Sequence, residues 1–179
     1  MIAKEPRHDN PVSSKKVSTE NIKSLVTDLG SQDGLVRVRA RKSLVAIGSQ
    51  AVKPLVLQLK SKREWCRWEA AKALGQIRDP AATQVLIRAL EDKMFDVRWL
   101  AAEGLIAMRR EALMPLLQAL IEHPDSSWLQ EGVHHVLYDL NKGDLAEILQ
   151  PVIAALEGFE PSLEAPLAAE KALETLTKK

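Results

Sequence analysis

The sequence predicts an all-α fold, a right-handed α-α superhelix (solenoid) in which about five helix pairs stack side by side. From Ser18 onward the apolar residues recur with the spacing of a helix, and no stretch alternates as a strand does. The helical pattern also repeats along the chain, with a period of about 31 residues. We expect one solenoid domain over residues 18–177 and a disordered tail over residues 1–17, which are polar and show no periodicity.

One helix of each pair carries a fixed pattern. It starts with an apolar residue followed by an arginine, and small or apolar residues come 4, 7, 8 and 11 positions after the start. These offsets fall on one face of a helix that turns about 100° per residue, so this face is predicted to be buried. Three clear copies start at Val36, Cys66 and Val97, and two weaker copies start at Leu129 and Ala165.

The other helix of each pair has a pattern of its own, with apolar residues three, four and seven positions after its first residue. Prolines fit this helix if they lie in its first turn, where the missing N–H costs no hydrogen bond. The copies start at Ile22, Val52, Thr83, Leu113 and Leu149, and the prolines are Pro54, Pro115 and Pro151.

With this period, Val-Arg followed by alanines, a leucine and an isoleucine resembles the HEAT repeat, in particular the short type named after phycobilisome (bilin) lyases. The resemblance spans residues 18–177 and is strongest over residues 33–122. It implies that the first helix type lines the convex side of the superhelix and the second type the concave side. The pattern is specific for the fold and says little about function. The two weaker copies depart from it, because Gln130 and Pro166 stand where the arginine belongs.

The composition excludes several classes of protein. A single cysteine rules out a disulfide framework, and no apolar run approaches the roughly 20 residues that cross a bilayer. The first residues lack the apolar core of a secretory signal. We therefore expect a cytoplasmic location and no membrane partner.

The net charge of +1 hides an asymmetry between the two parts of the chain. Residues 1–110 hold 21 Lys and Arg against 12 Asp and Glu, a balance of +9, whereas residues 111–179 hold 4 against 12, a balance of −8. Such a dipole favours an anionic partner at one end or head-to-tail self-association, although solvated faces explain the same composition. We expect a monomer or a weak head-to-tail oligomer.

All four tryptophans fall at two repeat-equivalent positions outside the predicted core. Exposed indoles often mark contact sites, and basic residues such as Arg63 and Lys72 surround them. We predict an aromatic and cationic patch that binds a protein or an anionic surface; alternatively, the indoles pack between neighbouring helices and seal the array. The four residues are Trp65, Trp68, Trp99 and Trp128.

The exposed ridge of the second helix type is basic at one end and apolar to neutral in the middle. This pattern predicts a groove for a helix or a peptide, with candidate residues Lys53, Leu57, Arg88, Met114 and Gln118. The resemblance to bilin lyases implies another ligand, a bilin. Its two propionates would need Lys53 and Arg88, beside Leu57 and Met114.

No catalytic, cofactor-binding or metal-binding residue is predicted. Cys66 falls at a core position, and the chain has no Ser-His-Asp set and no glycine-rich phosphate loop. Glu131, His135 and Asp139 share a helix face at four-residue steps, but solvated ion pairs explain this spacing. We expect the recurring arginines to form a structural ladder rather than a ligand clamp.

These observations predict a non-enzymatic scaffold for protein–protein interaction, whose partner is another protein. Two alternatives stay open. The resemblance implies a bilin lyase subunit or a chromophore chaperone, the one enzymatic interpretation considered. The basic N-terminal part favours nucleic-acid binding, against which stands the near-neutral isoelectric point of about 7.9.

Overall fold

The computed structural model describes residues 18–178. The tail predicted over residues 1–17 lies outside the described residues, so it stays a prediction. Between residues 18 and 178 the chain forms helices joined by turns and contains no strand, which confirms the all-α class. None of the described helices combines the length and the apolar character needed to cross a membrane.

Ten α-helices follow one another along the described residues, with short 3-10 helices before α3, α5 and α9. Consecutive helices pack in pairs, from α1 with α2 to α9 with α10. The α-helices are α1 (Thr19–Asp28), α2 (Gly34–Ile47), α3 (Val52–Gln58), α4 (Glu64–Ile77), α5 (Thr83–Ala89), α6 (Phe95–Met108), α7 (Arg110–Glu122), α8 (Ser127–Leu140), α9 (Ala146–Leu156) and α10 (Pro161–Thr177).

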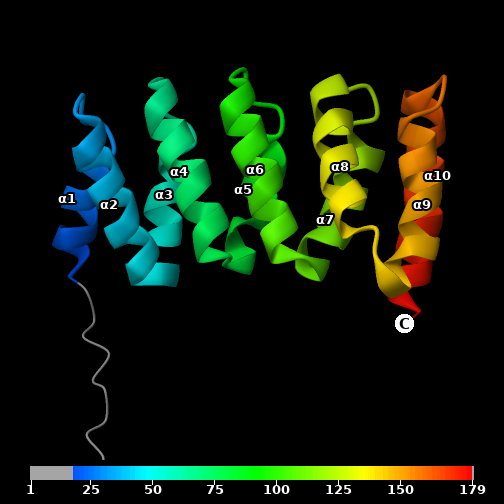
Figure 1. The fold of residues 1–179 in the computed structure, drawn as a ribbon, viewed down its shortest axis with the longest axis horizontal. Helices are drawn as coiled ribbons and strands as arrows, with labels where there is room; N and C mark the ends of the chain where they lie inside the picture. Colours follow the sequence, from blue (N-terminus) through cyan, green and yellow to red (C-terminus); the bar gives the residue numbers. More distant parts are fainter. Residues whose placement is uncertain (1–17, 179) are drawn as a thin grey trace, which may run out of the picture.

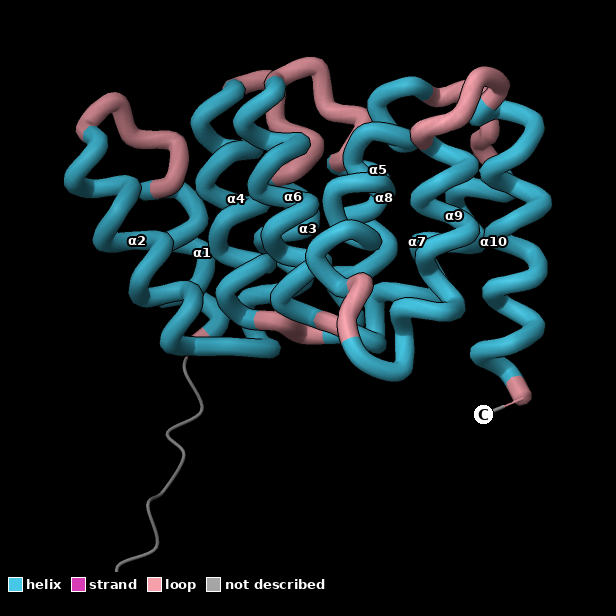
Figure 2. Tube along the Cα trace, turned by 45° about the vertical axis from the view of Figure 1, so that its right-hand side comes forward, coloured by secondary structure: helices cyan, strands magenta, loops and turns pink. Residues whose placement is uncertain are grey.

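The helices form two layers. Helices α2, α4, α6 and α8 lie side by side in one layer, and α1, α3, α5 and α7 lie in the layer behind it (Figure 1). We call them the first-helix layer and the second-helix layer. Turned by 45°, the array shows its loops gathered at the two edges of the layers (Figure 2). The predicted apolar stripe is buried at Ala40, Leu44, Ala70, Leu74, Ala101 and Leu105, but its small residue Ser43 in α2 is exposed, so the prediction is wrong there.

Short polar side chains explain where several helices begin. Asp33 caps α2 by accepting a hydrogen bond from the N–H of Leu35 at 2.8 Å. Asp79 accepts one from the N–H of Ala81 at 2.9 Å and so caps the short helix that precedes α5. The hydroxyl of Ser49 and this N–H both stabilise the carboxylate, and they lower the pKa of Asp79 below its ordinary value.

Prolines lie in the first turn of some helices and in the interior of others. Pro54 is the third residue of α3, as predicted. Pro115 and Pro151 lie inside α7 and α9, so the prediction of a first-turn position is wrong for both. The reason is that these helices begin earlier than the apolar pattern, at Arg110 and Ala146. Since proline has no N–H, each helix forgoes one hydrogen bond there.

Helices α4 and α6 approach each other closely at two glycines. A Cβ added to Gly75 would lie 2.8 Å from the Cα of Gly104, and a Cβ added to Gly104 would lie 3.0 Å from the Cα of Gly75. Backbone atoms cannot turn aside as a flexible side chain does. The separation of these two helices therefore requires glycine at both positions.

The last helix departs from the predicted order. The repeat pattern places α10 beside α8, but α10 packs against α7 and α9, while α9 contacts α8 (Figure 1). The predicted core face of α10 is nevertheless buried, at Ala165, Ala169 and Ala172. Pro166 stands at the position of the repeat arginine and has no side-chain donor. Helix α10 therefore lacks the bond with which that arginine anchors a first-layer helix.

Replacing Gly75 with alanine is expected to lower the free energy of unfolding. The new Cβ meets the backbone of α6, and overpacking of this kind costs about 1–3 kcal/mol, of which better helix propensity recovers up to about 1 kcal/mol. Gly34→Ala is the matched control, because its Cβ first meets Nη2 of Arg37 at 3.5 Å, an ordinary contact. Urea unfolding followed by circular dichroism measures both variants. A Gly75→Ala protein as stable as the wild type would show that α4 and α6 move apart without cost.

Candidate functional site

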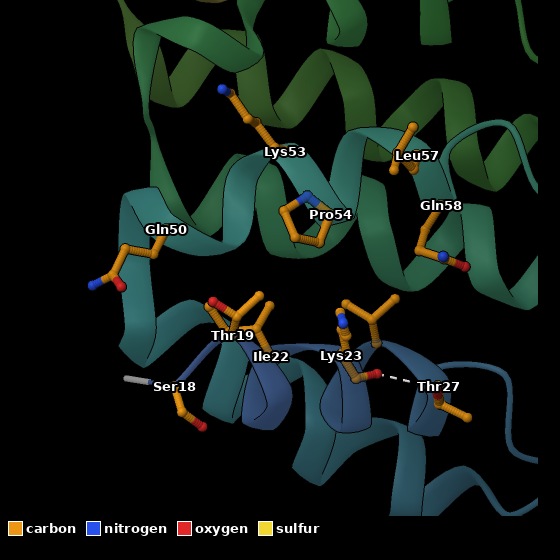
Figure 3. A pocket seen from close by; sticks show the side chains of 11 residues that line it. Ser18, Thr19, Ile22, Lys23, Thr27, Gln50, Lys53, Pro54, Leu57 and Gln58 are labelled. Atoms are coloured by element: carbon orange, nitrogen blue, oxygen red, sulfur yellow. Dashed lines mark hydrogen bonds between the residues drawn. The ribbon is translucent and has the colours of Figure 1, made fainter. Parts of the chain in front are cut away.

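A groove of about 950 Å³ lies between α1 and α3, in the second-helix layer. We call it the α1–α3 groove. Its apolar wall is formed by Ile22 and Val26 from α1 and by Pro54 and Leu57 from α3. The close-up shows the Pro54 ring facing α1 across the space between the two helices (Figure 3). The remaining lining is polar and uncharged except for two lysines.

The space exists because short side chains line both helices where they face each other. Thr19 and Thr27 supply small side chains from α1, as does its N-cap Ser18, and Pro54 supplies a compact ring from α3. The hydroxyl of Thr27 donates to the carbonyl of Lys23 at 3.0 Å, so it turns back onto its own helix (Figure 3). A volume of this size lies within the range of small-molecule sites, about 300–1,000 Å³.

The charge of the α1–α3 groove comes from Lys23 on α1 and Lys53 on α3. No carboxylate is present among the described residues that line it. Lys23 lies 3.6 Å from Glu20, but both side chains are well exposed, and ion pairs of this kind are weak and exchange easily. The groove thus offers an apolar wall with one ammonium group from each helix, which suits an elongated apolar ligand that carries two anionic groups.

The structure brings together two of the five residues predicted for the groove. Lys53 and Leu57 line it, whereas Arg88, Met114 and Gln118 lie exposed on α5 and α7 and are not among its lining residues. Gln118 instead donates to Glu122 on its own helix at 3.0 Å.

Sequence reasoning missed the contribution of α1, above all Lys23. A signal was present, because the pattern of the second helix type already begins at Ile22. Lys23 follows that residue directly, as Lys53 follows Val52 in the next copy.

The four tryptophans lie in the first-helix layer, at two junctions between neighbouring helices. Trp65 and Trp68 line a hollow of about 500 Å³ between α2 and α4. Trp99 and Trp128 line a smaller hollow of about 140 Å³ between α6 and α8. Trp65, Trp99 and Trp128 are 38%, 46% and 44% exposed, so each indole is partly packed and partly open to a partner.

Trp68 is half-buried and packs against the core, whereas the other three indoles are more exposed. Basic side chains lie over its ring. The ammonium group of Lys72 lies 4.6 Å from the ring centroid, and the guanidinium group of Arg41 lies 5.5 Å from it. Arg41 also pairs with the buried Glu69. The predicted basic residue Arg63 donates to the carbonyl of Gly30 at 3.2 Å, which ties α4 to the loop before α2.

The α6–α8 hollow holds a cation of its own. The Arg98 guanidinium lies 4.6 Å from the ring centroid of Trp128 and 5.6 Å from that of Phe95. The rings of Trp99 and His135 lie 4.6 Å apart, and His135 contacts Glu103 at 3.2 Å. Arg98 therefore already fills the position that a ligand cation would take in an aromatic cage.

The recurring arginines form a structural ladder, as predicted. Arg37, Arg67 and Arg98 each donate to the carbonyl oxygen six residues earlier, at 2.9 to 3.0 Å. Gln130 does the same at 2.5 Å, so the fourth copy keeps the bond without the arginine. The carboxylate of Asp92 also accepts two bonds from the buried Arg67, at 2.6 and 3.0 Å, and it raises the pKa of that guanidinium.

The other side chains that carry chemistry have structural partners. Cys66 is 3% exposed, and its thiol lies 3.6 Å from the carbonyl oxygen of Leu29. His134 contacts Glu157 at 2.8 Å, whereas the adjacent His135 points toward α6. Across residues 18–178 no three potential metal ligands come together.

The comparisons with known proteins agree with this architecture. A family model of HEAT repeats matches residues 22–106. The phycocyanobilin lyase subunit beta of Thermosynechococcus vestitus is 34% identical over 93 residues, which are 51% of this chain and 44% of that protein. The bilin biosynthesis protein RpcF of a Synechococcus species is 33% identical over 118 residues, 62% of this chain and 56% of that protein.

The chain is similar to HEAT-repeat proteins of the phycobilisome lyase type. The chain spans about half the length of the relatives that it matches. Their names contradict the expectation of a non-enzymatic scaffold, and with it the expectation that the chain is not an enzyme. They favour the alternative, a bilin lyase subunit. The error arose because the repeat pattern describes the packing of the helices and leaves the surface that binds a ligand unspecified.

Removing the carboxylate of Asp92 from this protein is expected to be strongly destabilising. Asp92→Ala leaves the buried Arg67 without its counter-charge, which costs about 3–5 kcal/mol in comparable buried pairs. Asp125→Ala, in the exposed turn before α8, is the control and should change stability by less than about 0.5 kcal/mol. Urea unfolding measures the difference. Equal stability of the two variants would mean that Arg67 is solvated rather than held by Asp92.

Proposed function

We propose that this protein is a bilin-handling lyase subunit, which binds an open-chain tetrapyrrole in the α1–α3 groove. The observation that carries the proposal is that two lysines, Lys23 from α1 and Lys53 from α3, line the groove beside an apolar wall. The names of the relatives supply the ligand class. Lys53 and Leu57 were already candidates for this ligand from the sequence, and α1 completes the site.

The chemistry of a bilin matches that of the groove. Its conjugated rings are apolar and gain by leaving water, for which Val26, Pro54 and Leu57 provide a surface. Its two propionates are anionic at neutral pH and need cations, which Lys23 and Lys53 supply as mobile point charges. Because the groove is open to solvent, each ion pair contributes up to about 1 kcal/mol, so the two lysines together hold and orient the ligand.

The chain holds the bilin without a covalent bond to itself. Cys66 is its one cysteine, and the thiol is buried in the core, away from the α1–α3 groove. A thiol in that position cannot reach a ligand at the surface. Attachment of the bilin then depends on a nucleophile from an acceptor protein, while this chain binds the bilin and fixes its orientation.

A second protein subunit belongs to this proposal. One relative is named as a subunit, which favours a partner chain for this protein as well. The partly exposed tryptophans Trp99 and Trp128 of the α6–α8 hollow offer such a partner an apolar contact beside Arg98. The groove and this hollow lie in different layers, so a partner on the hollow leaves the groove accessible.

Titration with phycocyanobilin tests the proposed site. We expect the wild type to change the visible absorption of the bilin, because binding restricts its conformation and removes water. Lys23→Met combined with Lys53→Met keeps the apolar stems but removes both charges, and it should weaken binding at least about 10-fold. Lys60→Met, next to α3 but outside the groove lining, is the matched control and should bind as the wild type does.

Two outcomes would contradict the proposal in different ways. An unchanged bilin spectrum with the wild-type protein would show that the protein does not bind the bilin. Binding that survives the double lysine substitution, or that falls equally with Lys60→Met, would keep the ligand and reject the α1–α3 groove as its site.

A further inference from the structure

The part of the first-helix layer around α2 and α4 has an apolar half and a basic half. We define this α2–α4 face as Leu35, Arg39 and Lys42 on α2 with Trp65 and Lys72 on α4. Leu35 is 67% exposed and Trp65 38%, and both line the hollow of about 500 Å³ near the start of their helices. One or two turns further along, Arg39 and Lys42 are exposed and Lys72 is half-buried.

The outer ridge of α10 carries the complementary pattern. Leu163 and Leu167, in the first two turns, are 61% and 54% exposed. Glu170 and Glu174 follow them, both exposed, and the steps of four, three and four residues keep all four side chains on one side of the helix. A terminal repeat of a solenoid normally presents a polar outer face, so these leucines call for a partner.

The spacing of the two halves is the same on both surfaces. Seven residues separate Leu35 from Lys42, and seven separate Trp65 from Lys72. Seven residues also separate Leu163 from Glu170 on α10. In a helix this separation is about 10 Å. A copy of α10 laid parallel to α2 and α4 therefore places leucines on the apolar half and glutamates beside the basic half at the same time.

We propose that the α10 ridge of one copy of this chain docks onto the α2–α4 face of a second copy, head to tail. The balance of +9 over residues 1–110 and −8 over residues 111–179 brings the opposite ends together. Because the contact joins two different surfaces, it is heterologous and builds a ring or an open chain of copies. The proposal is independent of bilin binding, since the α1–α3 groove lies in the other layer.

The charged groups of the proposed contact are available for it, except Lys72, whose ammonium group lies over the Trp68 ring. Between residues 18 and 178, Arg39, Lys42 and Glu170 take part in no ion pair. Glu174 pairs with Lys178 at 4.0 Å, with both side chains more than 70% exposed. A pair of that kind is weak and exchanges readily for an intermolecular one.

Sedimentation velocity of the full chain tests the proposal. At low salt, the mean mass should rise as the concentration increases from about 5 µM to about 500 µM, and about 0.5 M salt should return the protein to a monomer. Leu167→Glu places a charge in the apolar half and should weaken association at least about 10-fold. Met114→Glu is the control and should associate as the wild type does, because Met114 is an exposed apolar residue on α7, outside both surfaces and outside the α1–α3 groove.

A charge exchange separates the proposed contact from a general effect on the fold. Arg39→Glu with Lys42→Glu, and Glu170→Lys with Glu174→Lys, should each give a monomer, whereas an equal mixture of the two should associate again. Circular dichroism checks that the variants keep their helices. A wild type that stays monomeric at every concentration in low salt overturns the proposal, whatever the variants do. Association that is unchanged in either charge variant overturns it too.

Discussion

Each helix pair has an apolar side that is buried only by the neighbouring pair, and the stability of the whole array depends on this contact. One continuous cluster of buried residues runs from Ile22 in α1 to Ala172 in α10, through every helix between them. Neighbours must therefore approach to a fixed separation, which Gly75 and Gly104 set between α4 and α6. The surface sites follow from the same geometry. The α1–α3 groove and the aromatic hollows lie at junctions where neighbouring helices leave space unfilled.

Much of this fold was predictable from the sequence, because the period of the apolar residues is a direct consequence of stacking. The copies that start at Val36, Cys66 and Val97 fall on α2, α4 and α6, and their stripes face the core except at Ser43, which is exposed. The place of α10 was not predictable in the same way. Its buried residues are the small Ala165, Ala169 and Ala172, and their spacing does not indicate whether the neighbouring helices are α7 and α9 or α8.

The candidate site was predictable only in part. Lys53 and Leu57 were found because the repeat pattern shows which positions of a helix face outward. The α1 residues that line the groove with them were not found. A groove is the space that the side chains of two neighbouring helices leave open, and the repeat pattern of a single chain does not describe that space. Arg88 and Met114 were chosen because they occupy positions on the exposed ridge of the second helix type. They lie on α5 and α7, one and two helix pairs further along the array than α3. The geometry of the tryptophans fits both alternatives, since Trp65 lies between α2 and α4 and is still 38% exposed, and partner binding by these residues stays a prediction.

Because Cys66 is buried, its reactivity reports local opening of the structure around it. The thiol lies against the carbonyl of Leu29, where the end of α1 meets α4. A thiol-specific reagent reaches it after the first helix pair has separated locally from the second, so the labelling rate follows that opening. The same first pair supplies one wall of the α1–α3 groove. A molecule that clamps the two walls together would slow the labelling of a sulfur atom that it never touches.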